Sequence, residues 1–391
     1  MNQGRYIFSQ LLSYVPKDVI DRIVKKYEGN KYVKSFSCWN QFCVMVYAQL
    51  AERESLRDLE SVLMHHQSCL HHMGISSTVS KSTLSYANMT RNPEIFREMA
   101  LKMVKIARDL RVGRCKELDE YIDGDIYAFD STTISLCLSR FPWLKLHHEK
   151  AGVKLHTLFD VKTDIPTFFI YSEASLHDSR VMDKIPYVAG SYYVFDRGYM
   201  ATAMLYKIHN VHSFFVVREK NHMRFKLIEN RIADSTLGIL SDQIILLTGP
   251  KTKFQYPENI RRVTYQDAES GDTFIFYTNS LNVSADLIAL LYRRVELFFK
   301  WMKQHLHIKE FFGHNENAIQ IQIYTAISAY CIVAIAEHKL NLGRDMYEVL
   351  RVLQGSLYEK IALEDFFEQG KKWHFATDAP CDDGLQLLLN F

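Results

Sequence analysis

The sequence predicts an α/β fold, in which a mixed sheet flanked by helices follows a helical N-terminal domain and is interrupted by a β-rich insertion. Apolar residues recur at helical spacing over about the first 120 residues, and strand-like stretches begin near Asp125. Between residues 225 and 280, short β-like runs alternate with turn clusters such as Gly249-Pro250. From Ala285 the helical spacing returns and continues to about Lys339, followed by a further helical tail.

The composition of the 391-residue chain is that of an ordinary globular protein, with 48% hydrophobic and 24% charged residues. The net charge of +2 excludes nucleic acid binding through bulk charge alone, although residues 1–120 carry 18 Lys and Arg against 13 Asp and Glu. The seven cysteines form no CxxC pair, which indicates a reducing compartment and no zinc ribbon. With neither a signal segment nor a long uncharged apolar stretch, we expect a cytoplasmic protein without a membrane partner.

The N-terminal region contains a pattern that is compatible with a DNA-reading unit. Residues 40–64 form a helical stretch, Gly74 interrupts the pattern, and a short polar helix opens near Ser82. Lys81 and Arg91 lie at the two ends of this polar helix and are its candidate DNA-binding residues. A helix, a glycine turn and a polar helix suit the reading of DNA, and they suit an ordinary helical bundle equally well.

Five strand-like segments follow, and helical segments at residues 178–187 and 200–208 separate the last three of them. The strands are predicted at Asp125–Asp130, Gly152–Asp160, Thr167–Ser172, Tyr192–Asp196 and Ser213–Arg218. This order predicts three meandering strands and then parallel strands added through helical crossovers. The predicted divisions are a helical N-terminal domain (1–120), a first part of the core (121–223), the β-rich insertion (224–283), C-terminal core helices (284–340) and a helical tail (341–391).

Two aspartates follow apolar strand residues, and both are candidate metal ligands. Asp130 ends the first predicted strand and Asp196 ends the fourth. Side chains at the carboxyl ends of strands lie where α/β proteins bind ligands, and paired carboxylates there favour a hard cation. The alternative is that both are ordinary turn or cap residues.

A third acid lies on the helical stretch after the insertion. Glu296, Lys300 and Lys303 are spaced i, i+4 and i+7, so they share one helical face. They predict either a surface salt bridge, worth ~0.3–0.5 kcal/mol, or a metal ligand beside phosphate-binding lysines. Arg218 and Lys220, at the end of the fifth strand, are further candidates for DNA contact, with solvent-exposed strand-end charges as the alternative.

Several of these segments resemble the DDE transposases of the bacterial insertion-sequence-4 family. The matching motifs are, in chain order, AFDSTT, GVKLHTLFD, HDSRVMD, VFDRGY and VELFFKWMKQHL. The resemblance covers nearly the whole chain and implies a ribonuclease-H-like core that uses Mg²⁺, with Mn²⁺ as a substitute, and no other cofactor. It also implies cut-and-paste transposition on inverted-repeat ends and target DNA by a homodimer. It assigns the three catalytic acids and metal ligands to Asp130, Asp196 and Glu296, and the basic residue after them to Lys303.

The chain departs from the family pattern just before the third acid. The family has a tyrosine seven residues and an arginine four residues before the glutamate, whereas here Tyr292 precedes Glu296 by four. A loss of three residues rotates the preceding part of a continuous helix by ~300°. Arg293, at i−3, is then the candidate replacement for the absent arginine and a candidate DNA contact. Two alternatives follow: a catalytically impaired relative that acts as a DNA-binding regulator, and a metal-dependent nuclease of the same fold.

Overall fold

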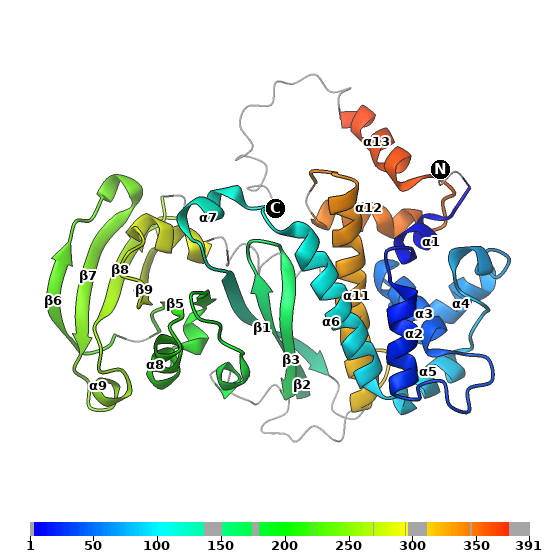
Figure 1. Cartoon of the computed structure of the whole chain (residues 1–391), viewed down its shortest axis with the longest axis horizontal. Helices are drawn as coiled ribbons and strands as arrows, with labels where there is room; N and C mark the ends of the chain where they lie inside the picture. Colours follow the sequence, from blue (N-terminus) through cyan, green and yellow to red (C-terminus); the bar gives the residue numbers. More distant parts are fainter. Residues whose placement is uncertain are drawn as a thin grey trace.

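The computed structural model describes residues 4–136, 151–173, 180–220, 222–268, 270–293, 295, 311–344 and 346–374. Figure 1 shows a sheet at one end of the molecule and a block of helices at the other. Two long helices, α6 (Pro93–Arg111) and α11 (Glu316–Lys339), run side by side between them.

Five strands form the central part of the sheet in the order β3-β2-β1-β4-β5. They are β1 (Ile126–Leu136), β2 (Ala151–Asp160), β3 (Ile165–Glu173), β4 (Tyr192–Phe195) and β5 (Phe214–Arg218). The first three form an antiparallel meander, and β4 and β5 continue parallel to β1. This topology is that of a ribonuclease-H-like core, so the predicted fold class is confirmed.

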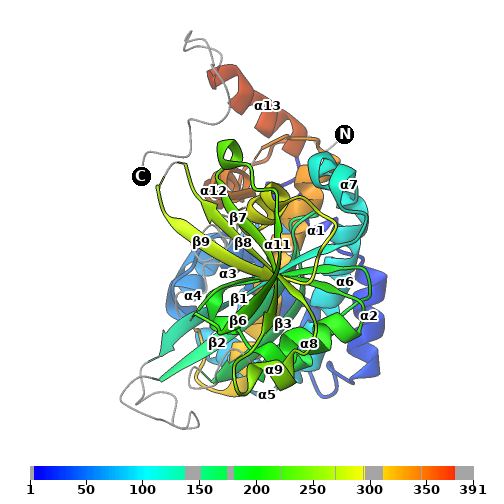
Figure 2. The same ribbon diagram turned by 90° about the vertical axis from the view of Figure 1, so that its left-hand side faces the viewer.

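The β-rich insertion extends the same sheet. It contributes β6 (Phe225–Arg231), β7 (Ile239–Leu247), β8 (Ile260–Gln266) and β9 (Thr273–Thr278), all antiparallel to their neighbours. The short elements η6 (Ser235–Leu237) and α9 (Thr252–Gln255) lie in its connections. Because β9 pairs with β5, the sheet has nine strands and ends at β6. Figure 2, in which the β6 side faces the viewer, shows the strands fanned by the twist of the sheet.

The two crossovers differ from each other. The predicted helix at residues 178–187 is wrong over its described part, because residues 181–187 contain only the 3-10 turn η4 (Met182–Lys184). Ile185 has an extended backbone, with φ −72° and ψ 130°, since the proline that follows disfavours the helical region. The apolar spacing is nevertheless real, because Val181, Met182 and Ile185 are buried against the sheet. The helix predicted at 200–208 is confirmed as α8 (Thr202–Asn210).

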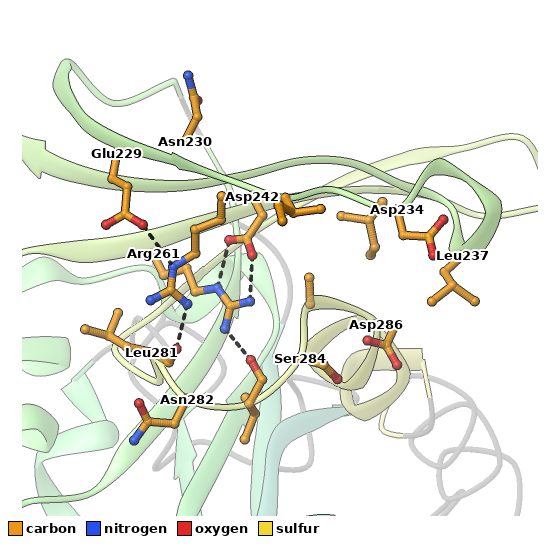
Figure 3. Close-up of a pocket in the computed structure, with 15 residues that line it drawn as sticks. Glu229, Asn230, Asp234, Leu237, Asp242, Arg261, Leu281, Asn282, Ser284 and Asp286 are labelled. Atoms are coloured by element: carbon orange, nitrogen blue, oxygen red, sulfur yellow. Dashed lines mark hydrogen bonds and ion pairs between the residues drawn. The ribbon is translucent and has the colours of Figure 1, made fainter.

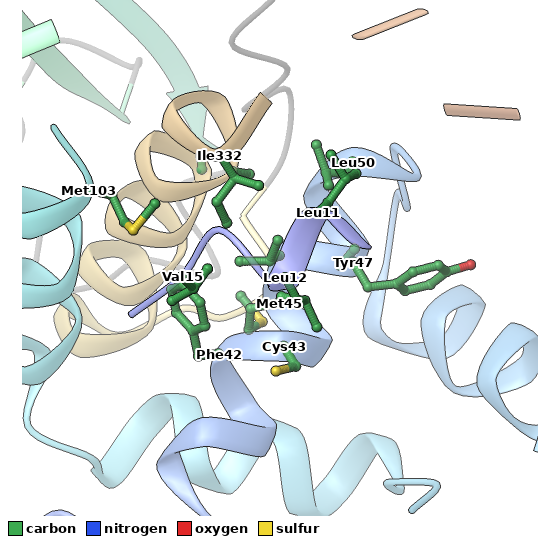
Figure 4. Packing of buried hydrophobic residues seen from close by; sticks show 14 of the residues in the cluster. Leu11, Leu12, Val15, Phe42, Cys43, Met45, Tyr47, Leu50, Met103 and Ile332 are labelled. Carbon is green, nitrogen blue, oxygen red and sulfur yellow. The ribbon is translucent and has the colours of Figure 1, made fainter. Parts of the chain in front are cut away.

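Helices from both ends of the chain share one apolar core. Its members are α1 (Ile7–Leu12), α2 (Lys17–Lys26), α3 (Cys38–Leu50), α4 (Leu56–His65), η1 (His71–Met73), α5 (Lys81–Thr90), α6, α11, α12 (Met346–Ser356) and α13 (Leu363–His374). Figure 4 shows Phe42 of α3, Met103 of α6 and Ile332 of α11 in this core. The C-terminal helices therefore pack on the N-terminal ones, and α7 (Lys116–Tyr121) leads from this block into β1.

Capping residues explain where the two central helices begin. The Asn92 side chain accepts a hydrogen bond from the backbone of Glu94 at the start of α6, and Asn315 accepts one from Ala318 at the start of α11. By length and composition α11 is apolar enough to cross a membrane. Within the protein, however, 94% of its most apolar window is buried, as is typical of a central core helix.

Two arginines of α6 attach the helical block to the sheet. Arg108 donates to the carboxylates of Asp160, at 2.7 Å, and Asp125, at 2.8 Å. Arg111 is fully buried, and its guanidinium lies 2.5 Å from the Glu337 carboxylate of α11. Arg111 also donates to the Thr163 carbonyl in the connection from β2 to β3, at 2.7 Å, so the two arginines fix α6 against this end of the sheet and against α11.

Candidate active site

The strand register brings Asp130 and Asp196 next to each other. The parallel pairing of β1 with β4 ends at Phe129 opposite Phe195, so each aspartate is the next residue on its strand. Neighbouring strands lie ~4.8 Å apart, which places the two residues side by side although 66 positions separate them. Asp196 directly follows the end of β4, within one residue of the predicted strand end. Asp130 does not end its strand, because β1 pairs with β2 as far as Leu136.

Strand alternation places both carboxylates on one face of the sheet. The residues just before them, Phe129 and Phe195, belong to the apolar cluster on the α8 side. Their immediate neighbours therefore project to the opposite face. That face is covered by a helix at residues 285–293, since Leu291 and Tyr292 belong to the apolar cluster that also contains Val194 of β4.

Tyr292 connects this helix directly to the second aspartate. Its hydroxyl donates a hydrogen bond of 2.9 Å to Asp196 Oδ1, and its ring packs on Phe276 of β9 with centroids 4.8 Å apart. Burial raises the pKa of Tyr292, and the neighbouring Asp196 carboxylate raises it further. The phenol therefore stays protonated at neutral pH and holds one carboxylate oxygen of Asp196 in place.

Arg218 lies beside the two aspartates, in the same row of residues across β1, β4 and β5. Phe195 of β4 pairs with Val217 of β5, so Arg218 follows at the level of Asp196. It is half-buried, and its guanidinium lies 4.6 Å from the centroid of the Phe274 ring. The row therefore combines two carboxylates with one cation, while Lys220 lies two residues further along in an exposed position.

A buried ion pair holds the loop that leads into the 285–293 helix. Arg261 of β8 makes a bidentate contact with Asp242 of β7, with both distances 2.8 Å. Its remaining nitrogen donates to the carbonyls of Val283, at 2.6 Å, and Ser280, at 3.2 Å. Figure 3 shows this guanidinium between Asp242 and the loop, beside a cavity of about 490 Å³. The start of the helix is thus fixed to the insertion.

The other predicted site residues have varied positions. Glu296, Lys300 and Lys303 lie outside the described residues. The Arg293 side chain points toward the end of β8, where its Nε is 3.9 Å from Asp267 Oδ2. Lys81 is exposed at the first turn of α5. The Arg91 guanidinium donates internally to Gln41, at 2.6 Å, and to the carbonyl of Phe36, and its DNA contact stays a prediction.

The donor set on the strands fits a hard divalent cation. Asp130 and Asp196 offer adjacent carboxylate oxygens, which are the ligands that Mg²⁺ prefers. In the part of the chain that the structure describes, no group of three or more His, Cys, Asp or Glu residues could hold a metal ion. A complete site would therefore need a ligand from beyond the described residues, and Glu296 is the predicted one.

Sequence reasoning missed three residues of this site: Tyr292, Arg261 and Asp242. The spacing of Tyr292 before Glu296 was a usable signal, because four residues place two side chains on one helical face. No such signal existed for Arg261 and Asp242. Their pairing depends on the register of β7 against β8, and β8 was not predicted.

Comparisons with known proteins agree with this geometry. A family model described as Transposase DDE domain matches residues 122–332, and one described as a domain of unknown function (DUF4372) matches residues 3–76. The protein y4zB of Sinorhizobium fredii, whose name assigns it as a transposase, is 32% identical over 215 residues. That match covers 54% of this chain and 59% of y4zB, so the chain spans little more than half of that relative.

Two further matches extend over more of the chain. A Synechocystis sp. protein named for transposition of the insertion sequence element IS4SA is 27% identical over 73% of this chain and 80% of its own length. A solved piggyBac transposase in a synaptic complex with hairpin DNA covers 96% of this chain and 86% of its own, with a TM-score of 0.46 and 11% identity. Since the transposase DDE domain model matches just over half of its residues, the chain belongs to the DDE transposase family.

Proposed function

We propose that the chain is a transposase that binds the inverted-repeat ends of its insertion sequence and cuts and rejoins DNA there, acting as a homodimer in the DNA complex. The observation that carries the proposal is the adjacency of Asp130 and Asp196, on the sheet face that the 285–293 helix covers. Tyr292 of that helix contacts Asp196, and Glu296 follows Tyr292 by four residues in the sequence. If the helix continues, the third acid approaches the same carboxylates.

The chemistry consists of two in-line displacements at phosphorus. In the first, a water oxygen bonds to phosphorus, the bond to the 3′ oxygen breaks, and that oxygen takes up a proton. In the second, the freed 3′-hydroxyl attacks a target phosphate and a DNA oxygen leaves in the same way. Two Mg²⁺ ions, when bound by Asp130, Asp196 and Glu296, would activate the attacking oxygen and stabilise the leaving one.

The chain's own residues would support these steps from the protein side. Tyr292 would keep Asp196 oriented, as partners of metal ligands commonly do. Arg218, in the row of the two aspartates, would neutralise a phosphate near the cleavage point. Lys300 and Lys303, four and seven residues beyond Glu296 in the sequence, would bind flanking phosphates.

The test is cleavage of a DNA fragment that carries the flanking inverted repeats. We expect cleavage with Mg²⁺ or Mn²⁺, none with EDTA, and a loss of at least about 1,000-fold in Asp130→Asn, Asp196→Asn and Glu296→Gln. Lys105→Ala is the matched control, because Lys105 is paired with Asp109 on the exposed side of α6. Full cleavage activity in Asp130→Asn would refute the assignment of Asp130 to the active site. Joining of a labelled donor end to target DNA separates a transposase from a nuclease of the same fold.

The shortened motif before Glu296 favours one alternative, a DNA-binding relative with impaired catalysis. Arg293, whose Nε lies 3.9 Å from Asp267, stays the candidate replacement for the absent arginine of the family motif. Reinsertion of three residues before Val295 distinguishes the two cases. If the chain is inactive and the insertion restores cleavage, the deletion has inactivated the enzyme. If the chain is already active and the insertion adds nothing, the short motif is sufficient for cleavage.

A further inference from the structure

A second cavity lies in the helical block, far along the sequence from the acids of the sheet. It has a volume of about 490 Å³ and lies between the turn of residues 27–36 and helix α5. Its lining includes Tyr32 and Lys34 from the turn, and Tyr86 from α5. The whole turn belongs to the segment that matches a domain of unknown function.

Two of the aromatic side chains in this cavity are exposed. Tyr32 is 92% exposed and Tyr86 is 64% exposed, while Phe36 closes the interior side at 8%. Isolated exposed aromatics are common on protein surfaces, but two that line one cavity offer a ligand two apolar ring surfaces. Lys31 and Lys34 flank Tyr32 in sequence, at exposed positions of the same lining, and Lys31 is paired with Glu28 at 2.7 Å.

The backbone holds Tyr32 in a costly conformation. Its φ of 60° is in the left-handed region, which costs a non-glycine residue of order 1–3 kcal/mol. The turn around it is firmly attached: Asn30 accepts a hydrogen bond of 2.8 Å from the Cys38 backbone, and Arg91 donates to the Phe36 carbonyl. The protein thus presents a large ring to solvent on a strained but well-anchored turn, a combination typical of binding residues.

The chemistry of the lining selects the class of ligand. Lysine is depleted in protein–protein interfaces, whereas aromatic rings interleaved with lysines are the usual lining of sites for single-stranded nucleic acid. A base inside a duplex has both faces covered by its neighbours, so stacking on Tyr32 or Tyr86 needs an unpaired base. On these grounds, we infer that this cavity binds an unpaired nucleotide of a DNA strand, with its base on the tyrosines and its phosphate near Lys34.

The position of the cavity suits a role in holding a DNA end. Helix α5 is attached to the start of α11, because Asn315 and Asn317 both donate to the Met89 carbonyl, at 2.9 and 3.0 Å. The nucleotide site is therefore fixed to the helix that packs beside the sheet. The inference rests on the proposed function for the choice of DNA, but its geometry is independent of the catalytic acids.

The test measures binding of the full chain to a labelled oligothymidylate of about 20 nucleotides and to a blunt duplex of the same length. Tyr32→Ala and Tyr86→Ala should each weaken binding of the single strand about 5- to 50-fold and leave duplex binding within about threefold. Tyr32→Phe keeps the ring and should bind within about twofold of the parent. Tyr121→Ala is the matched control, since Tyr121 is 67% exposed on α7, outside the cavity.

Two more variants separate binding from folding and from charge. Tyr32→Gly removes both the ring and the backbone strain, so it should raise the melting temperature while weakening single-strand binding as Tyr32→Ala does. Lys34→Ala should lower the salt slope of single-strand binding by about 0.7, and Lys105→Ala should leave the slope unchanged.

Several results would overturn the inference. One is that Tyr32→Ala and Tyr86→Ala bind the single strand within twofold of the parent. Another is that the parent chain does not bind oligothymidylate at all. A third is that the variants lose equal affinity for the single strand and for the duplex. A change in the oligomeric state of Tyr32→Ala with unchanged oligonucleotide affinity would identify a protein contact instead. Asp130→Asn distinguishes this inference from the proposed function, because it should abolish cleavage while binding oligothymidylate normally.

Discussion

The strand side and the helix side of the candidate active site are held in place in different ways. Asp130 and Asp196 are placed by backbone pairing of β1 with β4, which most side-chain substitutions leave intact. The 285–293 helix is held by side chains: its apolar face packs in the core on the sheet, Arg261 binds the loop at its base, and Tyr292 bonds to Asp196. The strand side should therefore withstand substitution, whereas the helix side should be sensitive to changes at a few residues.

The largest effect is expected at the base of the helix. Asp242→Ala leaves the guanidinium of Arg261 buried without its carboxylate, and the two side chains are only 5% and 2% exposed. Removal of one partner of a buried ion pair costs ~3–5 kcal/mol, which urea unfolding of the full chain would measure. Cleavage should fall with stability, because the loop before the helix loses its attachment.

Glu229→Ala is the matched control for this prediction. Glu229 lines the same cavity and faces Arg231 at 3.9 Å, but its side chain is 61% exposed, so the change should cost less than about 1 kcal/mol. Equal destabilisation by Asp242→Ala and Glu229→Ala would contradict the idea that Arg261 anchors the helix.

Because backbone pairing places the two aspartates, a substitution that disturbs the backbone should affect them most, and Gly124 is a suitable position. A Cβ at Gly124 would lie 2.1 Å from the carbonyl oxygen of Gly190, between the starts of β1 and β4. Backbone atoms cannot move aside as a flexible side chain would, so Gly124→Ala should cost ~1–3 kcal/mol and disturb the register of the two aspartates. Gly355→Ala, where nothing lies within 4 Å, should be neutral or slightly stabilising in the same unfolding measurement.

The same difference explains what the sequence could predict. The five core strands were predictable because buried strands are short apolar runs, and their order limits the topologies that bring Asp130 beside Asp196. The crossover before β4 was mispredicted because the apolar spacing at residues 181–185 is common to a helix and to a buried turn. Only the proline after Ile185 separates the two.

The helix side was less predictable because it depends on tertiary contacts. The Asp242–Arg261 pair joins residues of two insertion strands whose register no local pattern fixes. Arg91 was a predicted DNA contact on the basis of its exposed-looking position at a helix end. The folded chain directs the Arg91 guanidinium into the turn that carries Phe36, a contact between residues 55 positions apart that no local pattern predicts, and the DNA contact of Arg91 stays a prediction.

A smaller effect is expected from Tyr292→Phe, which removes one hydrogen bond to Asp196 and keeps the ring. Loss of such a partner of a metal ligand typically lowers activity about 10- to 100-fold. Because burial raises the pKa of Tyr292 above the usual value near 10, the hydroxyl donates at all pH values below that and loses its proton only above it. The ratio of parent to variant cleavage rates should thus be constant from about pH 6 to 9.

Tyr192→Phe is the control for that ratio. The Tyr192 hydroxyl is bonded to Ser280 at 2.9 Å, on the same sheet face but away from the acids. Its loss should lower stability by ~0.5–1.5 kcal/mol and change the cleavage rate of the folded chain little. A Tyr292→Phe variant that behaves like Tyr192→Phe would show that Asp196 needs no orienting partner.

The smallest effect is expected at Lys220, beyond the end of β5. Its exposed position near Arg218 suits a single phosphate contact, and a single contact changes affinity only a few-fold at moderate salt. The salt slope is the better measurement, because one lost contact to duplex DNA lowers it by about 0.9 whatever the absolute affinity. Lys220→Ala should show that decrease, and Lys105→Ala should not. An unchanged slope in Lys220→Ala would show that Lys220 is an ordinary solvent-exposed lysine. The DNA contacts on this strand would then extend no further than Arg218, which lies level with the two aspartates.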